Sequence, residues 1–188
     1  MIVFALTRWP NVLPLNFSAA YGLAFCAGVF PKRLPWWLPV GTLLVTDVVL
    51  NAFFYQTILF SDYMLVNYFA YAAIYWLGRQ FTAQASWLKL VGGGLLGAIV
   101  FYFITNTASW LQDIAYAKTL NGWIQALTVG TTGWPETWKF FRNTLMSGGL
   151  FTGLIAGAMK LYPPAEPAAE EEPETEEVGD AKPEENRS

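Results

Sequence analysis

Long apolar segments alternate along this chain with short polar ones that contain charged residues, proline or glycine. A helix needs about 20 mostly apolar residues to cross a hydrocarbon core of roughly 30 Å. The pattern therefore predicts membrane-spanning helices. The segments that reach or approach the required length are residues 13–30, 36–55, 63–77, 88–110 and 138–161.

One further segment, residues 118–130 with the sequence KTLNGWIQALTVG, is shorter and more polar. It is either another span, starting near Tyr116, or an amphipathic helix on the surface. We favour a span. The sequence then predicts an all-α polytopic membrane bundle of about six transmembrane helices, formed by residues 1–162.

Asp47 interrupts the apolar run LLVTDVVLNAFFY, residues 43–55. Asn51 follows four residues later, so on a helix both side chains lie on one face. An unpaired charge in a membrane or in a dry core costs several kcal/mol. Asp47 therefore needs a partner, and Arg142 is the best candidate.

Polar side chains occur inside the other clear spans as well. Intramembrane polar groups usually face the interior of a bundle or a water-filled cavity. Their distribution predicts a hydrated binding pocket, with Tyr71 and Trp110 as stacking surfaces. The alternative is that they only hydrogen-bond helices together, at about 0.6 to 2 kcal/mol for each bond. The candidate polar residues of the pocket are Asp47, Asn51, Asn67, Asn106, Arg142 and Asn143.

The composition supports a membrane protein. The chain is 54% hydrophobic and only 13% charged, whereas soluble domains carry about 25% charged residues. Residues 1–163 contain nine basic and four acidic residues, for a net charge of +5. The remaining ten acidic and two basic residues belong to a Pro- and Glu-rich segment without aromatic residues. We expect residues 163–188 to be a disordered tail, either without a function of its own or a docking site for a basic partner.

Several activities are excluded or disfavoured by residues that the chain lacks. There is no histidine and only one cysteine, Cys26, which removes the commonest metal ligand and the usual general base. A lone aspartate offers little acid–base chemistry, so we expect no enzyme activity, no metal and no cofactor. We expect no nucleic-acid partner either. The ATP-binding motif G-x-x-x-x-G-K-[ST] is absent, so any ATP hydrolysis would need a partner subunit.

Tryptophans gather near the ends of the predicted spans, as in the aromatic belt of a bilayer. Counted over six spans, the odd-numbered loops contain or adjoin more basic residues than the other side does. The former are Lys32, Arg33, Arg79, Lys89, Lys139 and Arg142, and the latter are Arg8, Lys118 and Lys160. The positive-inside rule would then place both termini outside. The tryptophans concerned are Trp36, Trp37, Trp76, Trp87, Trp110, Trp134 and Trp138.

Small residues form stripes at helical spacing. Gly149, Gly153 and Gly157 repeat every four residues near the end of the chain, and Ala20 and Ala24 do so near its start. Such stripes let helices approach closely. They either pack helices of this chain together or face a second protein.

Four stretches carry a resemblance to known proteins: RWPNVLPLNFSAAYGLAFCAGVF, LLVTDVVLN, FYFITNTASWL and KFFRNTLMSGGLFTGLIAG. They resemble a family of bacterial integral-membrane proteins known only as a domain of unknown function. The resemblance covers roughly residues 8–158, and in outline this family is similar to the S components of energy-coupling factor (ECF) vitamin transporters. It implies six helices, a substrate pocket capped by loops near residues 31–35 and 131–138, and Ala20 and Ala24 facing a transmembrane coupling subunit.

Two functions fit these features. The first is a substrate-binding or transport subunit in the bacterial inner (cytoplasmic) membrane, with a small polar organic molecule as substrate and a coupling subunit with ATPase subunits as partners. The second is a non-catalytic structural or accessory subunit of a larger membrane complex. In the second case the glycine and alanine stripes would be its contact surfaces.

Overall fold

The computed structural model describes residues 1–162, apart from the side chain of Val3, and these residues form helices and loops without strands. The predicted acidic tail, residues 163–188, lies outside the described residues. The all-helical fold is confirmed. The elements are α1 (Ile2–Thr7), α2 (Ala20–Val29), α3 (Trp37–Val49), the π-helical turn η1 (Leu50–Phe54), α4 (Asp62–Gly78), α5 (Trp87–Gln112), α6 (Leu120–Thr128) and α7 (Thr137–Leu161).

Three helices are long and apolar enough to cross a membrane. They are α5, α7 and the continuous helix Trp37–Phe54, which consists of α3 and η1. Six spans are not confirmed. The predicted span 13–30 is helical only over the ten residues of α2, because Asn16 has a positive φ of 60° and the preceding loop contains Pro14. With nine residues, α6 measures about 13 Å, which is too short to cross a bilayer.

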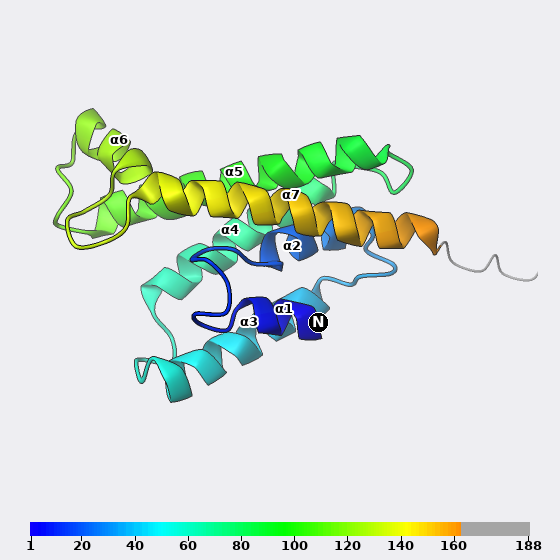
Figure 1. Ribbon diagram of the computed structural model, residues 1–188, viewed down its shortest axis with the longest axis horizontal. Helices are drawn as coiled ribbons and strands as arrows, with labels where there is room; N and C mark the ends of the chain where they lie inside the picture. Colours follow the sequence, from blue (N-terminus) through cyan, green and yellow to red (C-terminus); the bar gives the residue numbers. More distant parts are fainter. Residues whose placement is uncertain (163–188) are drawn as a thin grey trace, which may run out of the picture.

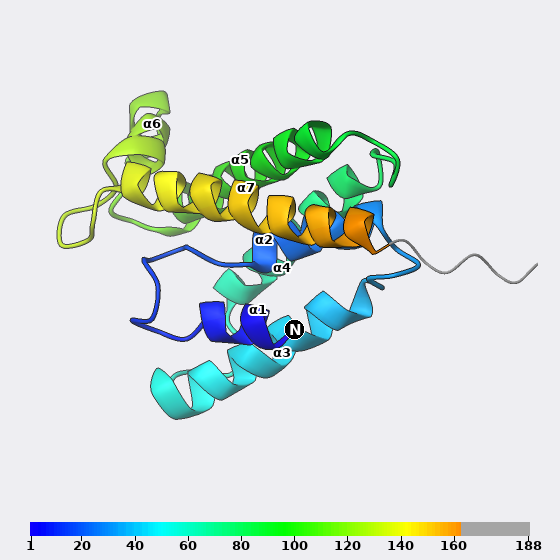
Figure 2. The same ribbon diagram turned by 45° about the vertical axis from the view of Figure 1, so that its right-hand side comes forward.

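Helices α2, α4, α5 and α7 pack into one group, while α1 lies against α3 beside it (Figure 1). Figure 2 shows the separation between the two groups from a second side. Every residue of α2 is buried. The side chains of Phe25, Ile74 and Leu90, from α2, α4 and α5, have no exposed surface and form the centre of the core.

Glycines allow the core helices to approach closely. A Cβ on Gly28 in α2 would overlap the carbonyl oxygen of Tyr75 in α4, and one on Gly22 would lie 2.6 Å from the backbone nitrogen of Thr152 in α7. Gly94 in α5 faces the side chain of the same threonine. Helix α2 is thus held at backbone distance between α4 and α7.

The close contact around Thr152 leaves its hydroxyl oxygen buried without a hydrogen-bond partner among the described residues. A buried polar group without a partner is destabilising, and an apolar group of the same shape removes this penalty. We therefore expect Thr152→Val to raise the free energy of unfolding by about 1 kcal/mol. Denaturation in detergent micelles measures the change, and a loss of stability would contradict the structure at this contact.

Candidate functional site

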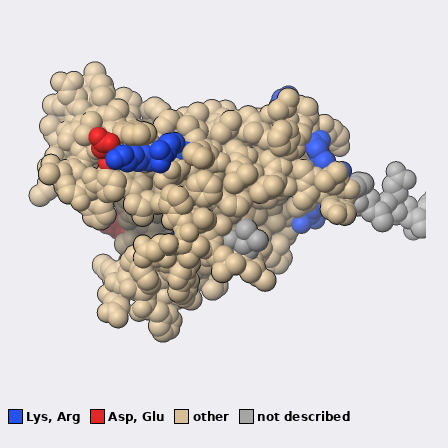
Figure 3. Space-filling view, viewed as in Figure 1, with Lys and Arg blue, Asp and Glu red and all other residues tan. Residues whose placement is uncertain are grey.

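A polar cavity of about 920 Å³ lies between the two groups of helices. The space-filling view shows the surface hollowed between the upper and lower groups (Figure 3). Its walls come from the loop between α1 and α2, from α3, α4 and α5, and from the loop before α7. Several separate elements thus contribute side chains to one space.

A charged pair lies in this cavity. The guanidinium Nη2 of Arg8 donates to Oδ1 of Asp47, and the hydroxyl of Tyr68 donates to Oδ2 of Asp47 at 2.7 Å. The side chains of Arg8 and Asp47 are 19% and 15% exposed. Each oxygen of the carboxylate therefore accepts one hydrogen bond, and its charge is neutralised within the chain.

The predicted partner of Asp47 was wrong. Arg142 is exposed on α7, where its guanidinium carbon lies 5.8 Å from the centre of the Trp138 ring and its nitrogens lie 3.4 Å from Oδ1 of Asn143. Arg8 is 39 residues from Asp47 in the chain. In the sequence, Arg8 lies beside the first predicted span, and nothing local shows that α1 folds back onto α3.

Five predicted pocket residues do line the cavity: Asp47, Asn51, Asn67, Tyr71 and Asn106. The Asn51 amide donates to the carbonyl oxygen of Leu59 at 3.3 Å, and that of Asn106 donates to Tyr102 at 2.8 Å. These amides keep acceptor oxygens for other partners, since each carries two lone pairs on its carbonyl oxygen.

An aromatic wall borders the polar groups. The ring centroids of Tyr21 and Phe101 are 4.8 Å apart, and those of Tyr71 and Phe101 are 4.9 Å apart. All three residues line the cavity. A planar or apolar part of a bound molecule can pack on such a surface.

The other predicted pocket residues lie elsewhere. The indole nitrogen of Trp110 donates to the carbonyl oxygen of Ala117 at 2.8 Å, outside the cavity. Asn143 is buried, and its amide donates to the carbonyl oxygen of Leu15 at 2.9 Å. Since Leu15 belongs to the loop that lines the cavity, Asn143 positions that loop and does not itself face the cavity.

The loop that precedes α7 lines the cavity through Thr131, Trp134 and Pro135, as the predicted cap at residues 131–138 requires. Residues 31–35 do not line it. They join the other end of α2 to α3, and Arg33 there donates to the carbonyl oxygen of Met159 at 2.5 Å. The predicted cap at 31–35 is therefore wrong.

Tyr116, in the loop after α5, adds a hydroxyl to the cavity. Burial, together with the charge of Asp113, raises the pKa of this tyrosine. The phenol therefore stays protonated at neutral pH and can donate a hydrogen bond. Within residues 1–162 no group of three or more His, Cys, Asp or Glu residues is arranged to hold a metal ion.

The small-residue stripes pack inside the chain. Ala20 and Ala24 are only 2% and 7% exposed, so they present no surface to a second protein. A Cβ on Gly149 would lie 3.0 Å from Leu95, and Cβ atoms on Gly153 and Gly157 would lie 3.1 and 3.6 Å from Trp87. The glycine stripe of α7 thus faces α5. The predicted role in partner packing is wrong for the two alanines.

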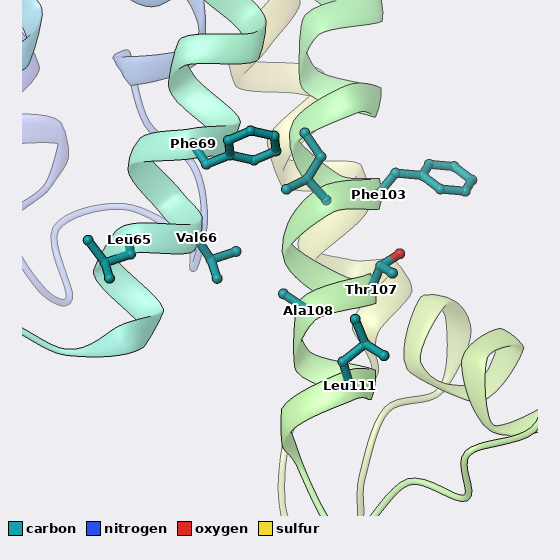
Figure 4. A pocket seen from close by; sticks show the side chains of 8 residues that line it. Leu65, Val66, Phe69, Phe103, Thr107, Ala108 and Leu111 are labelled. Carbon is teal, nitrogen blue, oxygen red and sulfur yellow. The ribbon is translucent and has the colours of Figure 1, made fainter.

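A second hollow, of about 590 Å³, lies on the outer surface between α4 and α5. Figure 4 shows Leu65, Val66 and Phe69 of α4 on one side of this groove. Phe103, Thr107, Ala108 and Leu111 of α5 border its other side. The groove is almost entirely apolar, and this distinguishes it from the cavity that contains the Arg8–Asp47 pair.

Comparison with known proteins gives a family without an assigned activity. The model of the family described as "Family of unknown function (DUF6580)" matches residues 1–169, so the chain belongs to this family. No curated protein matches the chain. No solved structure matches it either.

Proposed function

We propose that this member of the DUF6580 family is a multi-pass subunit of the bacterial inner membrane that binds a small polar organic molecule for transport, in the manner of an S component. The cavity that holds the Arg8–Asp47 pair is the observation that carries this proposal. Its volume falls within the range of about 300 to 1,000 Å³ that is typical of small-molecule sites.

The chemistry of the cavity supports a polar ligand. Its ion pair, its asparagine amides and its tyrosine hydroxyls offer both donors and acceptors, while the aromatic wall offers a packing surface. Intramembrane charges are expensive and usually mark a substrate path or a ligand site. Interhelical bonding alone would not require a hollow of this size around the charges.

The outer surface supports placement in a membrane. Met146, Leu150 and Leu154 repeat every four residues on α7 and are 58%, 49% and 59% exposed. Apolar side chains in such a row fit contact with lipid. We propose that α3, α5 and α7 cross the bilayer and that α4, at about 25 Å, crosses with them, so the chain has fewer than six full spans.

Transport would need further subunits. The chain lacks the phosphate-binding motif of ATPases. A transmembrane coupling subunit with ATPase subunits fits this role. With Ala20 and Ala24 buried, its contact surface on this chain is a different one from the alanine stripe.

Ligand binding is tested with an asparagine of the cavity wall. Asn67→Ala removes a polar amide from the cavity, and we expect it to weaken binding of a co-purifying small molecule about tenfold, equivalent to roughly 1.4 kcal/mol. Native mass spectrometry of gently extracted protein measures the bound fraction. Asn121→Ala is the matched control, because Asn121 is exposed on α6 and does not line the cavity.

The proposal fails if gently extracted protein carries no small molecule, or if the two variants bind it equally.

The apolar groove between α4 and α5 favours the second function, an accessory subunit, because a helix of another protein fits such a surface. Crosslinking that captures a stoichiometric partner without ATPase subunits would support this second function.

A further inference from the structure

The charged residues of the described chain are distributed unequally between the two ends of the helix bundle. Three chain segments meet at one end: the α2–α3 loop, the α4–α5 loop and the last turn of α7. Arg33 donates to the carbonyl oxygen of Met159, and Lys160 donates to that of Ala83 at 3.4 Å. We call this region the basic end, and its exposed basic residues are Lys32, Arg33, Arg79, Lys89 and Lys160.

Among the described residues, no acidic side chain belongs to the basic end. The acids Asp62, Asp113 and Glu136 lie at the opposite ends of α4, α5 and α7. That opposite end also carries Lys118, Lys139 and Arg142, so its basic and acidic side chains balance. Figure 3 shows basic atoms at the right-hand end of the molecule, while the acidic atoms visible on this face lie toward its left-hand end.

The basic residues are distributed between the two ends differently from the prediction that six spans give. Six alternating spans placed Lys139 and Arg142 on the same side as Lys32 and Arg33. Because α6 does not cross the bundle, Lys139 and Arg142 lie at the balanced end, and Lys160 joins the basic end. Within residues 1–162, the net excess of positive charge therefore belongs to a single end.

The cavity lies toward the balanced end. Its lining includes Ser61 at the start of α4, Asp113 after α5 and Thr137 at the start of α7. No residue of the α2–α3 loop, the α4–α5 loop or the last turn of α7 lines it. The basic end and the cavity are thus on opposite sides of the bundle.

We propose that the basic end binds the anionic headgroups of the cytoplasmic leaflet and thereby holds the cavity toward the outside of the cell. Cytoplasmic loops carry an excess of Lys and Arg, and anionic lipids attract basic residues close to the membrane surface. Exposed basic side chains from three segments, with no acid beside them among residues 1–162, fit an array of lipid phosphates. The inference rests on the proposed membrane location and not on the identity of the ligand.

Orientation is tested by labelling single cysteines in intact cells with a membrane-impermeant maleimide. The background is Cys26→Ala, because Cys26 is the chain's one cysteine and is fully buried. We expect Thr132→Cys, in the exposed loop at the cavity side, to react. Gln84→Cys, in the α4–α5 loop at the basic end, should react only after the cells are permeabilised. The reverse result, or equal labelling at both sites, would overturn the proposal.

The lipid contact is tested by native mass spectrometry of the whole chain extracted from nanodiscs of phosphatidylglycerol and phosphatidylcholine. Neutralising Lys32, Arg79 and Lys89 to glutamine should lower the preference for retained phosphatidylglycerol by about fivefold for each side chain. The control neutralises Lys118, Lys139 and Arg142 to glutamine and should keep the preference. Equal loss in both variants, or no preference in the wild type, would overturn the proposed lipid contact.

These readouts are independent of ligand binding. Asn67→Ala should weaken the ligand without changing which cysteine is labelled. If no ligand is found while the labelling is as expected, the proposed function fails and the orientation stands. If ligand binds but Gln84→Cys labels in intact cells, the orientation fails alone.

Discussion

Asp47→Asn is expected to lower the free energy of unfolding by about 3 kcal/mol, because it leaves the guanidinium of Arg8 in the cavity without its counter-ion. The asparagine keeps the shape of the aspartate and, in its carbonyl oxygen, a hydrogen-bond acceptor for Tyr68, so the loss reports the interaction with Arg8. Denaturation in detergent micelles measures it. The same variant should lose the bound small molecule if the ion pair contacts the ligand.

A double-mutant cycle separates the pair from its surroundings. Arg8→Gln and Asp47→Asn together should destabilise the protein by less than the sum of the two single changes, with a coupling of about 1 to 3 kcal/mol. Asp62→Asn is the control, since Asp62 is exposed at the start of α4, and it should change stability by no more than about 0.5 kcal/mol. Strictly additive effects of Arg8→Gln and Asp47→Asn would contradict the ion pair.

The second large effect is expected from Gly28→Ala. The added Cβ would overlap the carbonyl oxygen of Tyr75 and lie 2.9 Å from the backbone nitrogen of Arg79. Backbone atoms of a packed helix cannot move aside as a side chain can, so α2 and α4 must separate. We expect a loss of about 2 to 3 kcal/mol in the free energy of unfolding.

The same substitution at Gly92 provides the control. No described atom lies within 4 Å of a Cβ built on Gly92, and alanine has a higher helix propensity than glycine. Gly92→Ala should therefore be neutral or stabilise the protein by up to about 1 kcal/mol. A loss of equal size at Gly28 and Gly92 would show that helix propensity, and not contact between helices, determines the result.

Most helices could be predicted from the sequence because a long apolar run is a local property. The helices α4, α5 and α7 begin and end within two residues of the predicted segments. The first segment could not be predicted in the same way. Residues 13–30 are apolar enough as a whole to predict one span, yet Asn11 and Asn16 adopt φ values of 63° and 60° that keep the stretch before α2 in a loop.

The cavity was predictable where helical periodicity alone places side chains together. Asn67 and Tyr71 lie four residues apart on α4 and reach the same space. Arg142 and Asn143 were misplaced because the rotation of α7 about its own axis depends on its contacts with α2 and α5. Those contacts rest on Gly22 and Gly94, in other parts of the chain. Arg8 was missed for the same reason, since only tertiary packing brings α1 to Asp47.

Helix α2 measures about 15 Å and is buried along its whole length. It therefore has no boundary with lipid, and its length does not have to match the thickness of a bilayer. In the proposed membrane, hydrophobic mismatch would act on α3, α5 and α7, whose apolar side chains face outward. A thinner bilayer would increase the tilt of these outer helices and a thicker one would decrease it, while α2 would move with α4 and α7, to which its glycines hold it at backbone distance.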